Sequence, residues 1–88
     1  MRRARAMTMT LADLQEGQVA KITKIAGRGG AIRQRLLDMG VTRGTAVRVE
    51  RRAPLGDPIE VTVKGYHLAI RESEARHIHV EDVVDDTD

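Results

Sequence analysis

The sequence predicts a small, mainly β protein: a partly closed barrel of about five short strands, with one helix after the first strand. Three observations carry this prediction. Short runs rich in β-branched residues are separated by glycine, proline and charged turn residues along most of the chain. Only one segment shows clear helical periodicity. The chain has 88 residues, and partial closure lets so small a sheet protect its edges.

The first part of the domain is predicted to contain a short helical turn and then a strand. Thr10 and Asp13 have the spacing of a capping box, which would start the turn. Residues 18–26 (QVAKITKIA) lie between Gly17 and Gly27 and are dominated by β-branched residues, which favours a strand. Because the apolar positions in this run do not alternate regularly, we expect a β-bulge within it.

Residues 31–39 (AIRQRLLDM) are predicted to form the helix. Three apolar residues recur at the spacing of one helical face: Ile32, Leu36 and Met39. Gly40 follows the run directly and is expected to end the helix in the left-handed conformation that glycine adopts at low cost.

The second half of the chain is predicted to add strands over residues 45–52, 59–63 and 67–71, where apolar and polar residues alternate. Lys64-Gly65 is expected to join the second and third of these as a tight hairpin. Ser73 is predicted to cap a short turn over residues 74–77, which a last strand over 78–80 follows.

One domain is expected over residues 9–82, between two disordered tails. The tail at residues 1–8 is rich in arginine, and the tail at 83–88 is rich in aspartate. The net charge of the whole chain is +2, so the body between these tails is mildly basic. A solvated surface explains such a body more simply than a dedicated nucleic-acid face.

The composition excludes several classes of site. The chain has no cysteine, so disulfides, thiolate metal sites and cysteine nucleophiles are absent. It has one tyrosine and no other aromatic residue, so it lacks the rings that line proline-peptide grooves or stack single-stranded bases. Ser73 is the only serine, and paired carboxylates do not recur on one face, so we predict a protein that is not an enzyme.

Three motifs in the sequence are candidate chemical sites. Residues 27–30 (GRGG) precede a helix, but the lysine and hydroxyl residue of a phosphate loop do not follow them, which favours a simple turn. His77 and His79 could share a strand face, yet two imidazoles make an incomplete metal site, and the alternation predicts both to be exposed. Arginines near the helix could reach phosphate groups, although a solvated helix face is the simpler reading: Arg28, Arg33 and Arg35.

An ordered set of short motifs resembles the FeoA family. In sequence order they are LxxLxxG (11–17), RLLDMGV (35–41), GT (44–45), APLGDP (53–58), LAIR (68–71) and EAxxIxV (74–80). The match covers roughly residues 10–82, and the proline loop is its most specific element.

The resemblance implies an SH3-like β-barrel and a role in bacterial ferrous iron uptake. It implies a cytoplasmic accessory protein that binds and regulates FeoB, a membrane protein with a cytosolic GTP-binding domain, and that reaches the inner membrane only through this partner. It does not imply that the chain binds iron tightly, and the residues argue against tight binding; we expect no cofactor. Weak divalent-metal binding at His77 and His79 is the remaining metal hypothesis. The arginine-rich start and the acidic end depart from the family pattern.

Two adjacent surfaces are expected to contact the partner: the helix end (Leu36, Leu37, Met39 and Gly40) and the proline loop (Pro54, Leu55, Gly56 and Pro58). Small or preordered groups lose little entropy on docking. Leu55 could instead plug the open end of the barrel, and the sequence leaves both roles open. A nearby arginine, Arg28, Arg33 or Arg35, could stimulate GTP hydrolysis by the partner.

Two other functions stay open from the sequence. The mildly basic body allows a nucleic-acid-binding barrel, although the missing aromatic residues weigh against it. The histidines allow a metal-sensing domain in which a homo-oligomer completes the site at a subunit interface.

Overall fold

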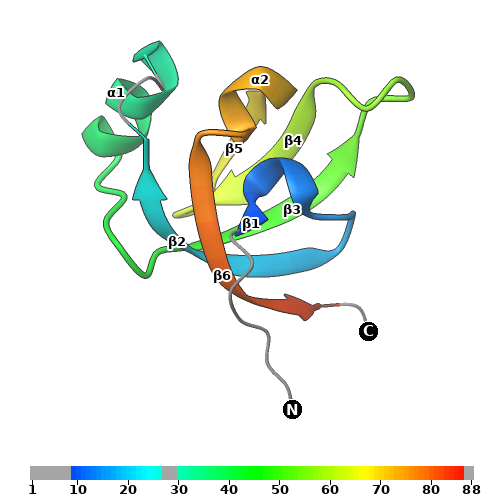
Figure 1. Cartoon of the computed structure of the whole chain (residues 1–88), viewed down its shortest axis with the longest axis horizontal. Helices are drawn as coiled ribbons and strands as arrows, with labels where there is room; N and C mark the ends of the chain where they lie inside the picture. The colour runs from blue at the N-terminus through cyan, green and yellow to red at the C-terminus, as the bar shows by residue number, and fades with distance from the viewer. Residues whose placement is uncertain (1–8, 27–29, 87–88) are drawn as a thin grey trace.

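The computed structural model describes residues 9–26 and 30–86. A six-stranded sheet runs in the order β1-β6-β2-β3-β4-β5, and every neighbouring pair is antiparallel. The strands are β1 Met9–Thr10, β2 Gln18–Ile25, β3 Ala46–Arg52, β4 Ile59–Val63, β5 Tyr66–Ile70 and β6 Ile78–Asp85. The helices are the 3-10 helix η1 Leu11–Asp13, α1 Gly30–Asp38 and α2 Glu72–Ala75. Figure 1 shows a strongly curved sheet with α1 at one end of the molecule.

The structure confirms the mainly β fold with one principal helix but has one strand more than the five expected. The additional strand, β1, consists of Met9 and Thr10 and pairs with Val80 and His79 of β6. Two residues are too few to show the alternation of apolar and polar residues that is typical of a strand, so the sequence pattern does not predict this strand. As a result α1 follows the second strand rather than the first.

The last strand extends beyond the predicted end at residue 80. Val84 pairs with Val19 and Asp85 pairs with Gln18, and the backbone N–H of Asp86 donates to the Gly17 carbonyl at 2.8 Å. The prediction of a disordered tail from residue 83 is therefore wrong for residues 83–85, which belong to β6. The other predicted tail, residues 1–8, lies outside the described residues.

The hairpin of β4 and β5 forms where it was predicted. Lys64 and Gly65 have φ values of 51° and 81°, and two consecutive residues of positive φ give the turn that best matches the twist of a two-residue hairpin. The expected irregularity in β2 is also present, because its pairing with β6 shifts register between Val19 and Lys21 and again between Ile22 and Lys24.

Helix α1 ends as the sequence predicts. Gly40 has a φ of 87°, its N–H donates to the Leu37 carbonyl at 3.0 Å, and the N–H of Val41 donates to the Leu36 carbonyl at 3.0 Å. These two bonds make a Schellman motif, which satisfies carbonyls that the helix itself leaves unpaired. The motif turns Val41 back into the core, where it is 3% exposed.

The caps of the two short helices differ in how well they were predicted. The capping box of η1 is confirmed, since the Thr10 N–H donates to the Asp13 carboxylate at 2.9 Å. The prediction for α2 is wrong: the helix begins at Glu72, before Ser73, and Arg71 is its N-cap. The Arg71 N–H donates to the Glu74 carboxylate at 2.9 Å, so Ser73 has no capping role.

The core is entirely aliphatic, as the lack of aromatic residues requires. Leu11 and Leu14 seal one side of it, and Ile32 and Leu36 attach α1 to the sheet. The remaining buried apolar residues come mainly from the strands: Ala20, Ile22, Val41, Val47, Val49, Ile59, Val61, Val63, Ile70, Ala75, Ile78 and Val80. No polar or charged residue is buried in the described part of the chain.

Candidate functional site: the proline loop and the surface of α1

The loop of residues 53–58 joins β3 to β4 and presents an apolar side chain to solvent. Leu55 is 96% exposed, more than any other large hydrophobic residue in the described part of the chain. Pro54 and Pro58 beside it are also exposed. A side chain that plugs the barrel would be buried, so the exposure of Leu55 rules out that role. The side chain remains free to contact another molecule.

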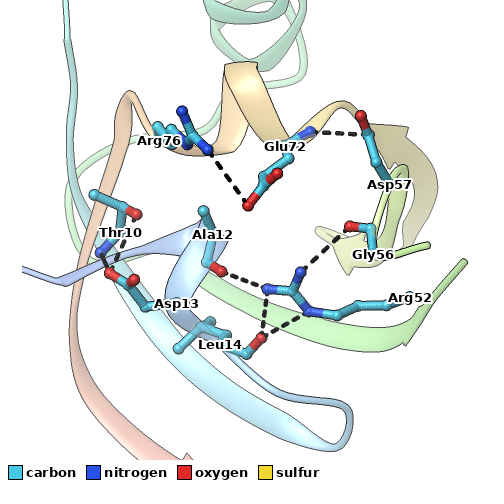
Figure 2. Close-up of polar contacts among 9 residues, drawn as sticks. All are labelled: Thr10, Ala12, Asp13, Leu14, Arg52, Gly56, Asp57, Glu72 and Arg76. Carbon is cyan, nitrogen blue, oxygen red and sulfur yellow. Dashed lines mark hydrogen bonds and ion pairs between the residues drawn. The ribbon is translucent and has the colours of Figure 1, made fainter. Parts of the chain in front are cut away.

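Arg52 holds the base of this loop against the start of the domain. Its guanidinium donates from Nε and Nη2 to the Leu14 carbonyl at 3.2 and 2.9 Å, and Nη2 also donates to the Ala12 carbonyl. Its Nη1 donates to the carbonyl of Gly56, within the loop, at 3.3 Å (Figure 2). One planar side chain thus ties η1, β3 and the loop together, which a flexible ammonium could not do with the same geometry.

Asp57 fixes the other side of the loop. Its Oδ1 accepts a hydrogen bond from the N–H of Glu72 at 3.0 Å, the first residue of α2 (Figure 2). A carboxylate at a helix N-terminus satisfies an otherwise unpaired donor. Within the loop, the Gly56 N–H donates to the Ala53 carbonyl at 2.7 Å. The loop is therefore preordered by contacts that leave Leu55 free.

The predicted residues at the end of α1 divide by burial. Leu36 is 1% exposed and belongs to the core, so it cannot be a direct contact for a rigid partner. Met39 is partly buried against the core, whereas Gly40 is exposed. Leu37 is 43% exposed and is the large apolar side chain that α1 presents to solvent.

The helix end and the proline loop are not adjacent, contrary to the expectation. Figure 1 shows α1 and the β3–β4 loop at opposite ends of the molecule. The expectation failed because it assumed that two family motifs form one surface, and a sequence does not state how far apart a curved sheet carries two of its loops.

The arginines near α1 are only partly described. Arg28, with Gly27 and Gly29 of the GRGG motif, lies outside the described residues. Arg33 and Arg35 are exposed, and neither forms an ion pair with any other described residue.

The histidines do not form a metal site with the described residues. His77 and His79 alternate with the buried Ile78 and Val80, as predicted, but both are half-buried rather than exposed because β1 and β2 flank this part of β6. The Nδ1 atom of His79 is buried without a hydrogen-bond partner. Across residues 9–26 and 30–86, no three histidine, cysteine or acidic side chains are grouped to hold a metal ion.

Within the same ranges, the helices are too short and too polar for any of them to cross a bilayer.

The anchors of the loop, Arg52 and Asp57, were not identified from the sequence. Arg52 contacts backbone atoms 38 and 40 positions away, and Asp57 caps a helix 15 positions away. No local spacing signals such contacts. The one available signal was the position of both residues at the edges of the most specific motif.

Comparison with known proteins gives a consistent result. A family model described as the FeoA domain matches residues 9–82. A relative from Porphyromonas gingivalis (strain ATCC BAA-308 / W83), an Fe(2+) transport protein A/Fe(2+) transporter FeoB fusion protein, is 37% identical over 73 residues. That match covers 83% of this chain and 8% of the relative, so the chain spans only a small part of the fusion protein.

Solved structures agree with the fold. The solution structure of the FeoA protein from Chlorobium tepidum is 45% identical, with a TM-score of 0.74 over 83% of this chain and 69% of that one. The crystal structure of Stenotrophomonas maltophilia FeoA complexed with zinc, described as a procaryotic SH3 domain protein, is 28% identical. Its TM-score is 0.77, and the match covers 90% of this chain and 99% of that one. The expected SH3-like fold is confirmed.

Proposed function

This chain belongs to the FeoA family, whose members are non-enzymatic accessory proteins of ferrous iron transport, and from that premise we propose that it binds and regulates a FeoB-type membrane GTPase transporter in the cytoplasm. The observation that carries this proposal is the Porphyromonas gingivalis relative, in which an iron transport protein A segment and a FeoB transporter form one polypeptide. Fusion holds two modules at high effective concentration, which benefits modules that contact each other.

The proline loop is the contact surface that the structure supports best. Leu55 is nearly fully exposed, while Arg52 and Asp57 hold the backbone on either side of it. Docking a preordered loop costs little conformational entropy, and an exposed leucine gains about 1.5–3 kcal/mol on full burial. Leu37 on α1 is the second candidate, on a separate surface.

The test is a titration of this protein against the purified cytosolic GTP-binding domain of the FeoB-type transporter from the same organism. We expect saturable binding in at least one nucleotide state. No binding up to about 1 mM, which corresponds to a binding free energy weaker than about −4 kcal/mol, with and without GTP or GDP, would overturn the proposal.

One specific form of regulation would be stimulation of the transporter's GTP hydrolysis by an arginine near α1. Arg33 and Arg35 are exposed and unpaired within the described residues. Arg33 lies one helical turn from the exposed Leu37, so it is the arginine that could reach a phosphate-binding site on the partner from this face of α1. This idea predicts faster GTP hydrolysis when the protein is added, a smaller increase with Arg33→Ala, and an increase close to that of wild type with Arg35→Ala. An unchanged hydrolysis rate would dismiss it without affecting the proposal that the two proteins bind.

The nucleic-acid alternative gains no support from the charges on the sheet and α2. Several basic side chains on the sheet and α2 lie within 4 Å of a carboxylate: Lys21, Arg48, Arg51 and Arg76. Cations that are already paired add little to a phosphate-binding surface.

A further inference from the structure

A hollow of about 180 Å³ opens beside α1, between this helix, β2 and the segment that joins α1 to β3. Its floor is aliphatic, with Ile22 and Val41 buried and with Ile25 and Leu37 partly open to solvent. We call this hollow, with its aliphatic floor and its three basic residues Lys24, Arg33 and Arg43, the α1 groove.

The pairing of the sheet explains why the groove exists. The ladder between β2 and β3 ends at Lys21 and Ala46. Backbone bonds on that edge continue only to Ile22, whose N–H donates to the Thr45 carbonyl at 2.8 Å and whose carbonyl accepts from the Gly44 N–H at 2.7 Å. Beyond this point β3 no longer covers β2, so α1 and its following segment flank residues 23–25 without filling the space.

The charged residues that line the groove are all basic. Lys24, Arg33 and Arg43 contribute to its lining, and none of them forms an ion pair with another described residue. By contrast, Arg48 and Arg51 on the sheet each lie against a carboxylate. An aliphatic floor with three uncompensated cations complements a ligand that is apolar at its centre and acidic around it.

The volume of the groove further limits which class of ligand can bind there. Sites for drug-sized molecules usually measure about 300–1,000 Å³, so 180 Å³ is too small for a nucleotide and suits one large aliphatic side chain. A bare phosphate or a lipid headgroup would use the cations but not the aliphatic floor. The groove therefore fits a polypeptide segment better than either.

We propose that the α1 groove binds an acidic segment of the transporter's cytosolic domain, which inserts one aliphatic residue onto Leu37 and Ile25 while its carboxylates meet Lys24, Arg33 and Arg43. This inference rests on the proposed function and names the chemistry of the contact on the α1 side. It is separate from the contact at the proline loop, since Figure 1 shows the β3–β4 connection and α1 at opposite ends of the molecule.

The test compares charge reversals on one helix. Arg33→Glu changes a residue that lines the groove, and Arg35→Glu makes the same change two positions along α1 at a residue that does not line it. Because residues two apart on a helix face different directions, the second variant is a matched control. Arg43→Glu repeats the test from outside the helix. Each variant is titrated against the cytosolic domain of the transporter, and its melting temperature is measured in parallel.

We expect Arg33→Glu and Arg43→Glu each to weaken binding about tenfold, with Arg35→Glu within about twofold of wild type and all melting temperatures similar. Higher salt should weaken the wild type more than Arg33→Glu. Equal binding by all variants would overturn the groove proposal but leave the proposed function intact, whereas a wild type that does not bind would contradict the proposed function itself. Binding of the wild type to phosphatidylglycerol vesicles that Arg33→Glu abolishes, with binding to the domain unchanged, would assign the groove to a membrane surface and overturn the proposal.

Discussion

Replacing Arg52 with alanine should destabilise the domain far more than an ordinary surface arginine substitution. The guanidinium of Arg52 donates to three backbone carbonyls, those of Ala12, Leu14 and Gly56. A hydrogen bond from a charged donor contributes about 1.5–3 kcal/mol, and water can replace part of this because the site is only partly buried. We therefore expect a loss of about 2–3 kcal/mol in the free energy of unfolding, rather than the sum of three full bonds.

The neighbouring residue provides the control. Arg51 makes one ion pair, with Glu60 at 3.5 Å, and both side chains are largely exposed. Such a pair is worth less than about 1 kcal/mol. Arg52→Lys keeps the charge but not the planar fork, so it should recover little of the lost stability.

Thermal unfolding followed by circular dichroism measures the difference. In a domain of this size, 1 kcal/mol shifts the melting temperature by roughly 4–8 °C, so Arg52→Ala should melt roughly 8–24 °C below wild type. Chemical denaturation should give the same order of variants. If Arg52→Ala melts within about 3 °C of Arg51→Ala, the guanidinium does not hold the loop and η1 together, and the reasoning is wrong.

Three further substitutions test separate parts of the structure by chemical denaturation. Asp57→Ala removes the acceptor for the Glu72 N–H and should lower the free energy of unfolding by about 1 kcal/mol, and Asp57→Asn should recover part of this loss. Equal stability of the wild type and both variants would show that the cap is unimportant. Gly40→Ala places a Cβ at a φ of 87° and should lower the free energy of unfolding by about 1 kcal/mol or more, whereas Ala31→Gly at the exposed start of α1 provides a comparison for general glycine effects. No loss of stability in Gly40→Ala would argue against the Schellman motif. Leu55→Ser should change stability by less than about 0.5 kcal/mol because the side chain is 96% exposed, and a larger loss would indicate that Leu55 packs against the domain.

The parts of the fold that follow from short-range rules were predictable. The hairpin of β4 and β5 follows from strict alternation and a two-residue turn, and the end of α1 follows from a glycine after an apolar helical stripe. The missed elements lack such local signals. β1 has two residues, and the end of β6 mixes valine with aspartate, so its composition indicates a solvated tail although its backbone pairs with β2.

The candidate site was predictable in part for the same reason. The sequence marks the proline loop as a motif and allows two roles for Leu55, a partner contact or a plug over the barrel. Its exposure in the structure is compatible only with the first. The anchors of the loop and its distance from α1 depend on how the sheet curves, which brings Arg52 to Leu14 and Asp57 to Glu72. The α1 groove arises where the pairing of β2 with β3 stops, and no spacing in the sequence marks that point.

The most direct measurement is a titration of wild-type protein and Leu55→Ala against the cytosolic domain of the FeoB-type transporter. Because most of the leucine side chain is lost while the fold stays intact, we expect the wild type to bind and Leu55→Ala to bind about tenfold more weakly, with unchanged melting temperature. Equal affinities would remove the proline loop from the interface, and no binding by the wild type would contradict the association itself.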